Sequence, residues 1–275
     1  MDTYPVWGNY LFHYTSASAL IGMFSRRKIW ATDFQYLNDA LEGKLLTKRL
    51  LEMSEAPHIH FSGLQFPKKH LDALRMHVGR GKIFYVASFS KRPDMLTQFR
   101  MYCPPAGGFV IGFPREYLER VGVLVDVEYD RSHDAWCSDF FCRFMVAARA
   151  EDRGELSSEQ LEYAIACATS LSDERSNAGI KRKSDEFASE EEVRLVYTGS
   201  IANNVRASRQ GNLLVPYVEL DLPNEAIQVQ IGSGPGRHRD LAHQSIVNLT
   251  IVARESGTLW QVGQLGNGEF SFREI

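Results

Sequence analysis

Short β-rich segments separated by Gly and Pro recur along the 275 residues of the chain and constrain its fold more than any other feature. Aromatic and β-branched residues fill these segments, as is typical of strands. Helical patterns lie between only some of the segments, so the order is not the strict alternation of a parallel α/β protein. The sequence therefore predicts an α+β fold, in which flanking helices cover a mixed, largely antiparallel sheet. We expect strands at 10–15, 29–32, 83–89, 109–113, 121–129, 193–197, 213–222, 226–231, 259–262 and 269–272.

Apolar residues spaced three or four apart predict the helices. In the first helix Leu20, Ile21 and Phe24 form one face, and Thr15 or Ser16 can cap its N-terminus. Helices are expected at 17–24, from about 39 to 53, from 67 to about 78, at about 157–171 and at about 237–255.

No internal repeat or low-complexity segment divides the chain, which favours one α+β domain over residues 1–275. Amphipathic and polar sequence around 153–185 predicts a helical insertion into this domain. Within it, the polar stretch 172–183 predicts an exposed connection that leads to the next strand.

The charge balance bears on partners and location. Lys and Arg total 31 and Asp and Glu total 34, so the formal net charge is −3. This balance gives no general attraction for nucleic acid or anionic lipid, although a local groove lined by Arg100, Arg206 and Arg209 would escape a whole-chain count. No run approaches the roughly 20 apolar residues that cross a bilayer, and the first residues lack a signal-peptide pattern. We expect a cytoplasmic protein without a membrane partner.

Cysteine and histidine spacing gives no metal or disulfide pattern. None of the four cysteines is spaced as C-x-x-C, so we expect no disulfide framework. His58 and His60 alternate but have no further cluster of ligands around them. No metal is therefore expected.

The segment from Glu190 to Arg194 carries the most informative spacing. On a strand, alternate side chains share a face, so Glu190, Glu192 and Arg194 would converge. Two adjacent carboxylates raise the pKa of one of them, and a neighbouring Arg lowers it again. Such a cluster could supply one base and one stabilising charge. Two alternatives remain open: an exposed acidic start to the strand, and an acidic first turn of a helix over 185–192.

Two further segments carry polar side chains that suit binding. His13 lies between aromatic residues in the strand at 10–15 and is either a binding residue or an ordinary core histidine. Ser88 and Ser90 place two hydroxyls on one face at the end of a strand, where small polar residues also simply terminate strands.

The order of the short motifs resembles a bacterial family. The motifs are FHYTS at 12–16, IWAT at 29–32, Leu37-Asn38-Asp39 with Glu42, ASFS at 87–90, GFVIGF at 108–113 after Tyr102, Glu190-x-Glu192-x-Arg194-Leu195, Pro216-Tyr217 and Ile231-Gly232. Over most of the chain they are similar to the uncharacterised family called domain of unknown function 2971. The N-terminal and E-x-E-x-R motifs are the most specific. The chain departs from the family at 98–102 (QFRMY), where members tend to have Trp before the Tyr.

The same motif order is similar to that of the ADP-ribosyltransferases. Those enzymes carry a His or Arg on a first strand, a Ser or Tyr in the next core motif, and a catalytic Glu, often in E-x-E, on a later strand. The resemblance implies an ADP-ribosyltransferase-like fold, with NAD as the substrate and Glu192 and Glu190 as the catalytic residues. The residues that it assigns to NAD binding are His13, Tyr14, Thr15, Ser88, Ser90 and Arg194.

These assignments agree with the chemistry of NAD cleavage. Breaking the bond between nicotinamide and ribose builds positive charge on the sugar, which a carboxylate such as Glu192 stabilises. His13 and Ser88 could hold the ribose and the nicotinamide amide by hydrogen bonds. Glu190 could orient or deprotonate the acceptor. Arg194 could hold Glu192 or contact a pyrophosphate oxygen.

Three functions follow as hypotheses. The first is an NAD-dependent ADP-ribosyltransferase, or an NAD glycohydrolase, that acts as a bacterial toxin or phage-defence effector. Its acceptor would be protein or nucleic acid, and an antitoxin or defence-system protein would be its partner. The second is a non-catalytic nucleotide-sensing or protein-interaction module that uses the same pocket. The third is a nuclease that holds a divalent metal with Asp39, Glu42 and the Glu190 pair.

Overall fold

The computed structural model describes residues 8–37, 83–104, 107–129, 143, 146–155, 157, 159–160, 178–198, 204–207, 212–234, 239–255, 257 and 259–265. Its strands are β1 (Tyr10–Thr15), β2 (Lys28–Asp33), β3 (Tyr85–Ser90), β4 (Phe109–Pro114), β5 (Val123–Asp126), β6 (Glu128–Tyr129), β7 (Arg182–Lys183), β8 (Glu192–Tyr197), β9 (Asn204–Ala207), β10 (Leu214–Asp221), β11 (Gln228–Ser233) and β12 (Gln261–Gln264).

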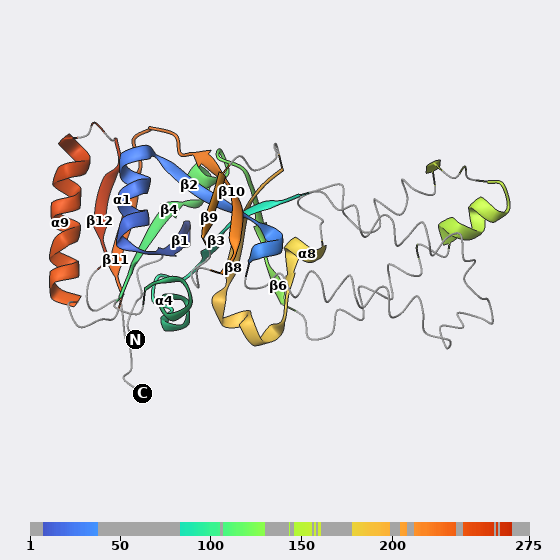
Figure 1. Ribbon diagram of the computed structural model, residues 1–275, viewed down its shortest axis with the longest axis horizontal. Coiled ribbons are helices and arrows are strands. Elements are labelled where there is room, and N and C mark those ends of the chain that lie inside the picture. Colours follow the sequence, from blue (N-terminus) through green and yellow to red (C-terminus); the bar gives the residue numbers. More distant parts are fainter. Residues whose placement is uncertain are drawn as a thin grey trace.

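Within the described residues, ten of these strands form one sheet (Figure 1). The order is β12-β11-β4-β1-β3-β2-β10-β9, and β8 pairs with both β3 and β5. Its pairs are antiparallel except β11 with β12, while β6 and β7 form a separate parallel pair. The expected class, a mixed and largely antiparallel sheet with flanking helices, is confirmed.

The first helix shows how the local sequence sets helix boundaries. Ser16 has an extended backbone, and its hydroxyl accepts from the Ala19 N–H at 3.2 Å, as expected for an N-cap. Arg27 ends the helix in the left-handed region at φ 51°, and β2 begins at the next residue. The described helical segments include α1 (Ala17–Arg26), α4 (Leu96–Tyr102), α5 (Arg115–Leu118), α8 (Ala178–Lys181), α9 (Arg239–Glu255), and the 3-10 turns η1 (Phe34–Tyr36) and η2 (Asp185–Glu190).

Several expected elements differ from the structure or lie outside it. The strand expected at 121–129 is divided into β5 and β6. The helices expected at 39–53 and from 67, most of that at 157–171, and the strand at 269–272 lie outside the described residues.

The expectation of an exposed connection at 172–183 is wrong at its described end. The side chains of Ile180 and Lys183 are both 0% exposed. Ile180 packs against Val86, Val125 and Val196, so this segment contributes to the core. The single domain over 1–275 and the insertion around 153–185 stay predictions.

Helices cover both faces of the sheet. On one face, Leu20 and Phe24 of α1 and Ile246 of α9 pack against the largest apolar cluster, which includes the buried Trp260 ring. In Figure 1, α9 lies beside β11 and β12. On the other face, Phe99 of α4 closes a second cluster, and the segment that contains α8 closes a third. The sheet is therefore buried from both sides over its central strands.

One edge of β3 is shared by two different strands, which splits the sheet. At its start β3 pairs with β2, through Tyr85↔Asp33 and Val86↔Thr32. At its end it pairs with β1 through Ser90↔Phe12 alone. Between these contacts, residues 87–89 have no partner on this edge among the described strands. Their other edge is fully paired with β8. A split thus opens between β1 and β2, with β3 at its base.

Two glycines of this region predict opposite effects of alanine on stability. A methyl group at Gly112 would lie 2.5 Å from the fully buried Phe12 ring, so we expect Gly112→Ala to lower the free energy of unfolding by about 1–3 kcal/mol. A methyl group at Gly22, inside α1, would meet nothing within 4 Å. Gly22→Ala should raise stability by about 1 kcal/mol. Urea denaturation of both variants measures this, and a Gly112→Ala midpoint equal to that of the wild type would contradict the packing argument.

Candidate functional site

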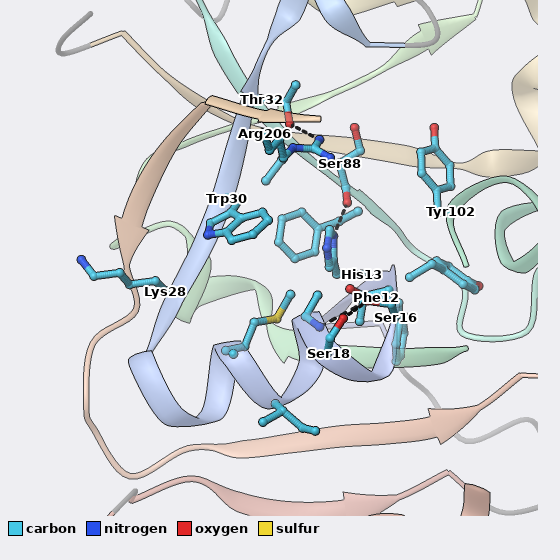
Figure 2. A pocket seen from close by; sticks show the side chains of 18 of the residues that line it. Phe12, His13, Ser16, Ser18, Lys28, Trp30, Thr32, Ser88, Tyr102 and Arg206 are labelled. Carbon is cyan, nitrogen blue, oxygen red and sulfur yellow. Dashed lines mark hydrogen bonds between the residues drawn. The ribbon is translucent and has the colours of Figure 1, made fainter. Parts of the chain in front are cut away.

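A cavity of about 700 Å³ occupies the split between β1 and β2 (Figure 2). Residues from β1, α1, β2, β3 and α4 line it, with Arg206 of β9 at one side. Along β2 the side chains alternate: Lys28, Trp30 and Thr32 line the cavity, whereas Ile29 and Ala31 belong to the core. The cavity thus depends directly on the pleat of β2 and on the missing pairing along β3.

His13 occupies the split and contacts the unpaired part of β3. Its Nδ1 lies 2.9 Å from the carbonyl oxygen of Ser88, and its ring lies 5.5 Å from that of Phe89. Because a carbonyl only accepts, Nδ1 carries the proton, and Nε2 remains an acceptor in the neutral ring. Burial lowers the pKa of His13, although the hydrogen bond to Ser88 partly opposes this. The neutral imidazole is therefore favoured, and it replaces the missing strand as a partner of β3.

Tyr14 and Thr15 line the same cavity, but the Tyr14 hydroxyl and the Thr15 carbonyl already have structural partners. The Tyr14 hydroxyl donates to the Arg92 carbonyl at 2.6 Å and accepts from the Met95 N–H at 3.0 Å. The Thr15 carbonyl accepts from the Cys103 thiol at 3.3 Å, and Thr15 is 5% exposed. Both residues therefore shape the wall of the cavity.

Ser88 joins the cavity to the E-x-E segment. Its carbonyl oxygen accepts from His13, and its side chain lines the cavity and is one of the groups that lower the pKa of Glu192. The backbone register agrees, because Ser88 pairs with Arg194 and Ser90 with Glu192 across β3 and β8. The sequence-predicted order His13, Ser88, Glu192 is thus a chain of contacts in space, in which Ser88 is the middle member.

Glu192 and Arg194 lie together on one face of β8. Val193 and Leu195 point into the main core, so the alternating Glu192 and Arg194 point to the opposite face. Arg194 holds the carboxylate with two hydrogen bonds, Nε to Oε1 at 3.0 Å and Nη2 to Oε2 at 3.2 Å. Its Nη1 donates to the Ile180 carbonyl at 2.6 Å. Arg194 is therefore fixed at both ends of its guanidinium group.

Lys183 completes this cluster. Its Nζ lies 2.6 Å from Glu190 Oε2 and 3.3 Å from Glu192 Oε2, and it sits over the Phe187 ring at 4.8 Å. Glu190 is the last residue of η2 rather than a strand residue, because Glu191 turns the chain at φ 45°. The three expected side chains converge nevertheless. We call Lys183, Glu190, Glu192 and Arg194 the buried charge cluster; each is at most 4% exposed.

The buried charge cluster lowers the pKa of Glu192. Burial would raise the pKa of Glu192, but the charges of Arg194 and Lys183, with hydrogen bonds from Arg194 and Ser88, outweigh it and lower the pKa to about 2. The expected lowering by a neighbouring Arg therefore describes Glu192, and Lys183, which was expected in an exposed connection, adds to it.

Not all of the sequence-predicted residues line the cavity. His13, Tyr14, Thr15 and Ser88 do. Ser90 is 1% exposed and uses its hydroxyl to donate to the Glu190 carbonyl at 2.7 Å. The three remaining members of the set belong to the buried charge cluster, behind Ser88: Glu190, Glu192 and Arg194.

Several further residues line the cavity that the motifs did not indicate. Trp30 is 43% exposed on the cavity wall, and Thr32 accepts from Arg206 Nη2 at 3.0 Å. The alternation of polar and apolar residues in KIWATD, at 28–33, was the available signal. Of the expected basic groove, Arg206 lines this cavity, Arg100 is exposed on α4, and Arg209 lies outside the described residues.

Metal and membrane features can be reported for the described residues only. There, no three His, Cys, Asp or Glu side chains are grouped as metal ligands. Asp39 and Glu42, which the nuclease hypothesis needs, lie outside the described residues. No described helix combines the length and the apolar character that a membrane span requires.

Comparison with protein-family models, with curated proteins and with solved structures found no significant match to this chain.

The buried charge cluster predicts acid-sensitive folding. The pKa of Glu192 is about 2 in the folded chain and near its ordinary 4.5 when unfolded, so ionised Glu192 favours the folded state above that ordinary value. This contribution, about 3 kcal/mol, should be lost as the pH falls from about 5 to about 2. We expect Glu192→Gln to be less stable at neutral pH, because buried cations lose a partner, and to show a shallower loss on acidification.

Chemical denaturation at several pH values measures these free energies of unfolding. Glu191→Gln is the matched control, because Glu191 is the exposed neighbouring carboxylate. Parallel pH profiles for wild type and Glu192→Gln would overturn the argument.

Proposed function

We propose that the protein is an NAD-dependent ADP-ribosyltransferase, or an NAD glycohydrolase that uses the same site. NAD would occupy the cavity in the split sheet, with His13 and Ser88 as its first contacts. Glu192 would supply the negative charge that the reaction needs. The observation that carries the proposal is the continuous series of contacts from His13 through Ser88 to Glu192.

The roles follow from the groups that each side chain presents. His13 Nε2 is an acceptor, which suits a ribose hydroxyl. Ser88 lines the cavity and interacts with the ionised Glu192, so a hydrogen bond donated to that carboxylate would make its oxygen more negative toward the cavity. The charge of Glu192 thereby acts on a ribosyl cation through Ser88. Glu190 and Arg194 act as positioning residues, because both hold the buried charge cluster and neither lines the cavity.

The biological setting belongs to the same proposal. An enzyme that consumes or transfers ADP-ribose would act in the cytoplasm, as a bacterial toxin or a phage-defence effector. Its acceptor would be a protein or a nucleic acid, and an antitoxin or a defence-system protein would control it. The resemblance to ADP-ribosyltransferases, in motif order, supports this reading by analogy.

The neutrality of the buried charge cluster favours a second function, binding without turnover. Lys183 and Arg194 carry two positive charges, which equal the two negative charges of Glu190 and Glu192. Within these four side chains the charges therefore balance. A nucleotide-sensing or protein-interaction module would keep such a cluster for its structural value, with the same cavity as its binding site.

Nicotinamide release from NAD tests the two functions against each other. An active enzyme should release nicotinamide, and Glu192→Gln should slow the release by about 100-fold or more, as is typical when a group that stabilises transition-state charge is removed. Glu191→Gln should match the wild type. Ser88→Ala and His13→Asn, which leave the buried ion pairs intact, should also slow the release. The products separate the two enzymes, since a glycohydrolase yields free ADP-ribose and a transferase labels an acceptor.

NAD binding without nicotinamide release would favour the sensing module. Equal release by the wild type and Glu192→Gln would contradict the assignment of Glu192.

A further inference from the structure

The cavity has a one-sided charge. None of its described lining residues is Asp or Glu, whereas Arg26, Lys28 and Arg206 all line it. Lys28 is paired with Asp221 at 2.7 Å, so its charge is already balanced. Arg206 forms no ion pair with any carboxylate of the described chain. The cavity wall therefore favours an anionic ligand over a cationic one.

Arg206 is held in place but not fully satisfied. It reaches from β9 across β10 to β2, where Nη2 donates to Thr32 Oγ1 at 3.0 Å. Its Nε is buried and has no hydrogen-bond partner within the described residues. Burial lowers the pKa of Arg206, and the only charged or phenolic group that opposes this is Tyr217. A guanidinium that has no carboxylate partner among the described residues is a suitable partner for an oxyanion.

Trp30 offers a flat surface on the same wall. One side of its ring packs on Tyr217, with centroids 4.7 Å apart, and its Nε1 donates to Glu219 at 3.2 Å. The side chain is nevertheless 43% exposed and lines the cavity (Figure 2). Thr32, which holds Arg206, lies two residues further along the same strand, a spacing of roughly 6.6 Å. An aromatic surface and a guanidinium group thus line the same cavity, the first on β2 and the second hydrogen-bonded to that strand.

We infer that Arg206 forms a phosphate subsite for a nucleotide whose base stacks on Trp30. The inference rests on the proposed function for the nucleotide class of the ligand, and it adds the residues that recognise that class. A planar guanidinium binds two phosphate oxygens at once, and an indole ring accepts any base on its face. Neither residue takes part in the chain of contacts from His13 to Glu192, so the subsite can be tested without catalysis.

Calorimetry with ADP and with adenosine tests the subsite directly. The wild type should bind ADP at least roughly tenfold more tightly than adenosine, because charge-assisted hydrogen bonds are made only to the phosphates. Arg206→Gln should remove this preference and leave adenosine binding unchanged. Arg206→Lys should retain part of it, since the charge remains but the paired donors are lost. Trp30→Leu should weaken the binding of both ligands. The matched control is Arg254→Gln, an exposed arginine of α9 that does not line the cavity.

The inference is overturned if the wild type shows no preference for ADP, or if Arg206→Gln keeps the full preference. The thermal midpoint of each variant identifies a failure to fold. If Arg206→Gln does not fold, the preference of the wild type for ADP over adenosine and the partial preference of Arg206→Lys test the subsite instead. A preference for ADP that depends on Arg206 supports the subsite even where nicotinamide release is absent, and then only the proposed enzymatic activity fails. If Arg206→Gln releases nicotinamide at the wild-type rate and keeps the wild-type preference for ADP, the subsite is overturned but the proposed enzymatic activity is not.

Discussion

The double pairing of one edge of β3 is the constraint on which the candidate site depends. Strand β3 uses one edge entirely for β8 but divides the other between β2 and β1. The unpaired stretch leaves the Ser88 carbonyl without a strand partner on that side, and His13 supplies the missing donor. Because buried carbonyls need partners, the placement of His13 in the split has a structural cause before it has a functional one. The cavity is the space that this arrangement leaves between β1 and β2.

The buried charge cluster is the second constraint, and it acts on folding and on chemistry together. A buried ion pair offsets a large desolvation cost only when its geometry is good, and removal of one partner leaves a costly unpaired charge. Here a bidentate Arg194 and a bridging Lys183 satisfy Glu192. Lys183 follows α8, so the cluster also attaches this segment to β8 through Glu192. An enzyme that uses Glu192 would therefore have its charge set by the segment at 178–190.

The sequence predicted the elements of the fold better than it predicted their pairing. Periodicity located α1 and nearly all of the described strands of the large sheet, because each pattern reflects one local face. It also predicted that Glu190, Glu192 and Arg194 converge. Lys183 was missed because a polar stretch gives no sign of burial, although its partners Glu190 and Glu192 are only seven and nine residues away. The split was missed because pairing between β1, β2 and β3 is non-local.

Ser88 links these two constraints, and its position explains why the site resists a simple assignment. A catalytic carboxylate usually faces its substrate, but Glu192 faces Arg194 and Lys183 and reaches the cavity only through a neighbouring hydroxyl. Its charge is fully present, because its pKa is about 2, yet it is balanced within the cluster. Lys183 contacts both carboxylates of the cluster, so the charge at Glu192 depends on the segment that carries Lys183 as well as on β8. A substitution of Lys183 would therefore act on Glu192 although Lys183 does not line the cavity.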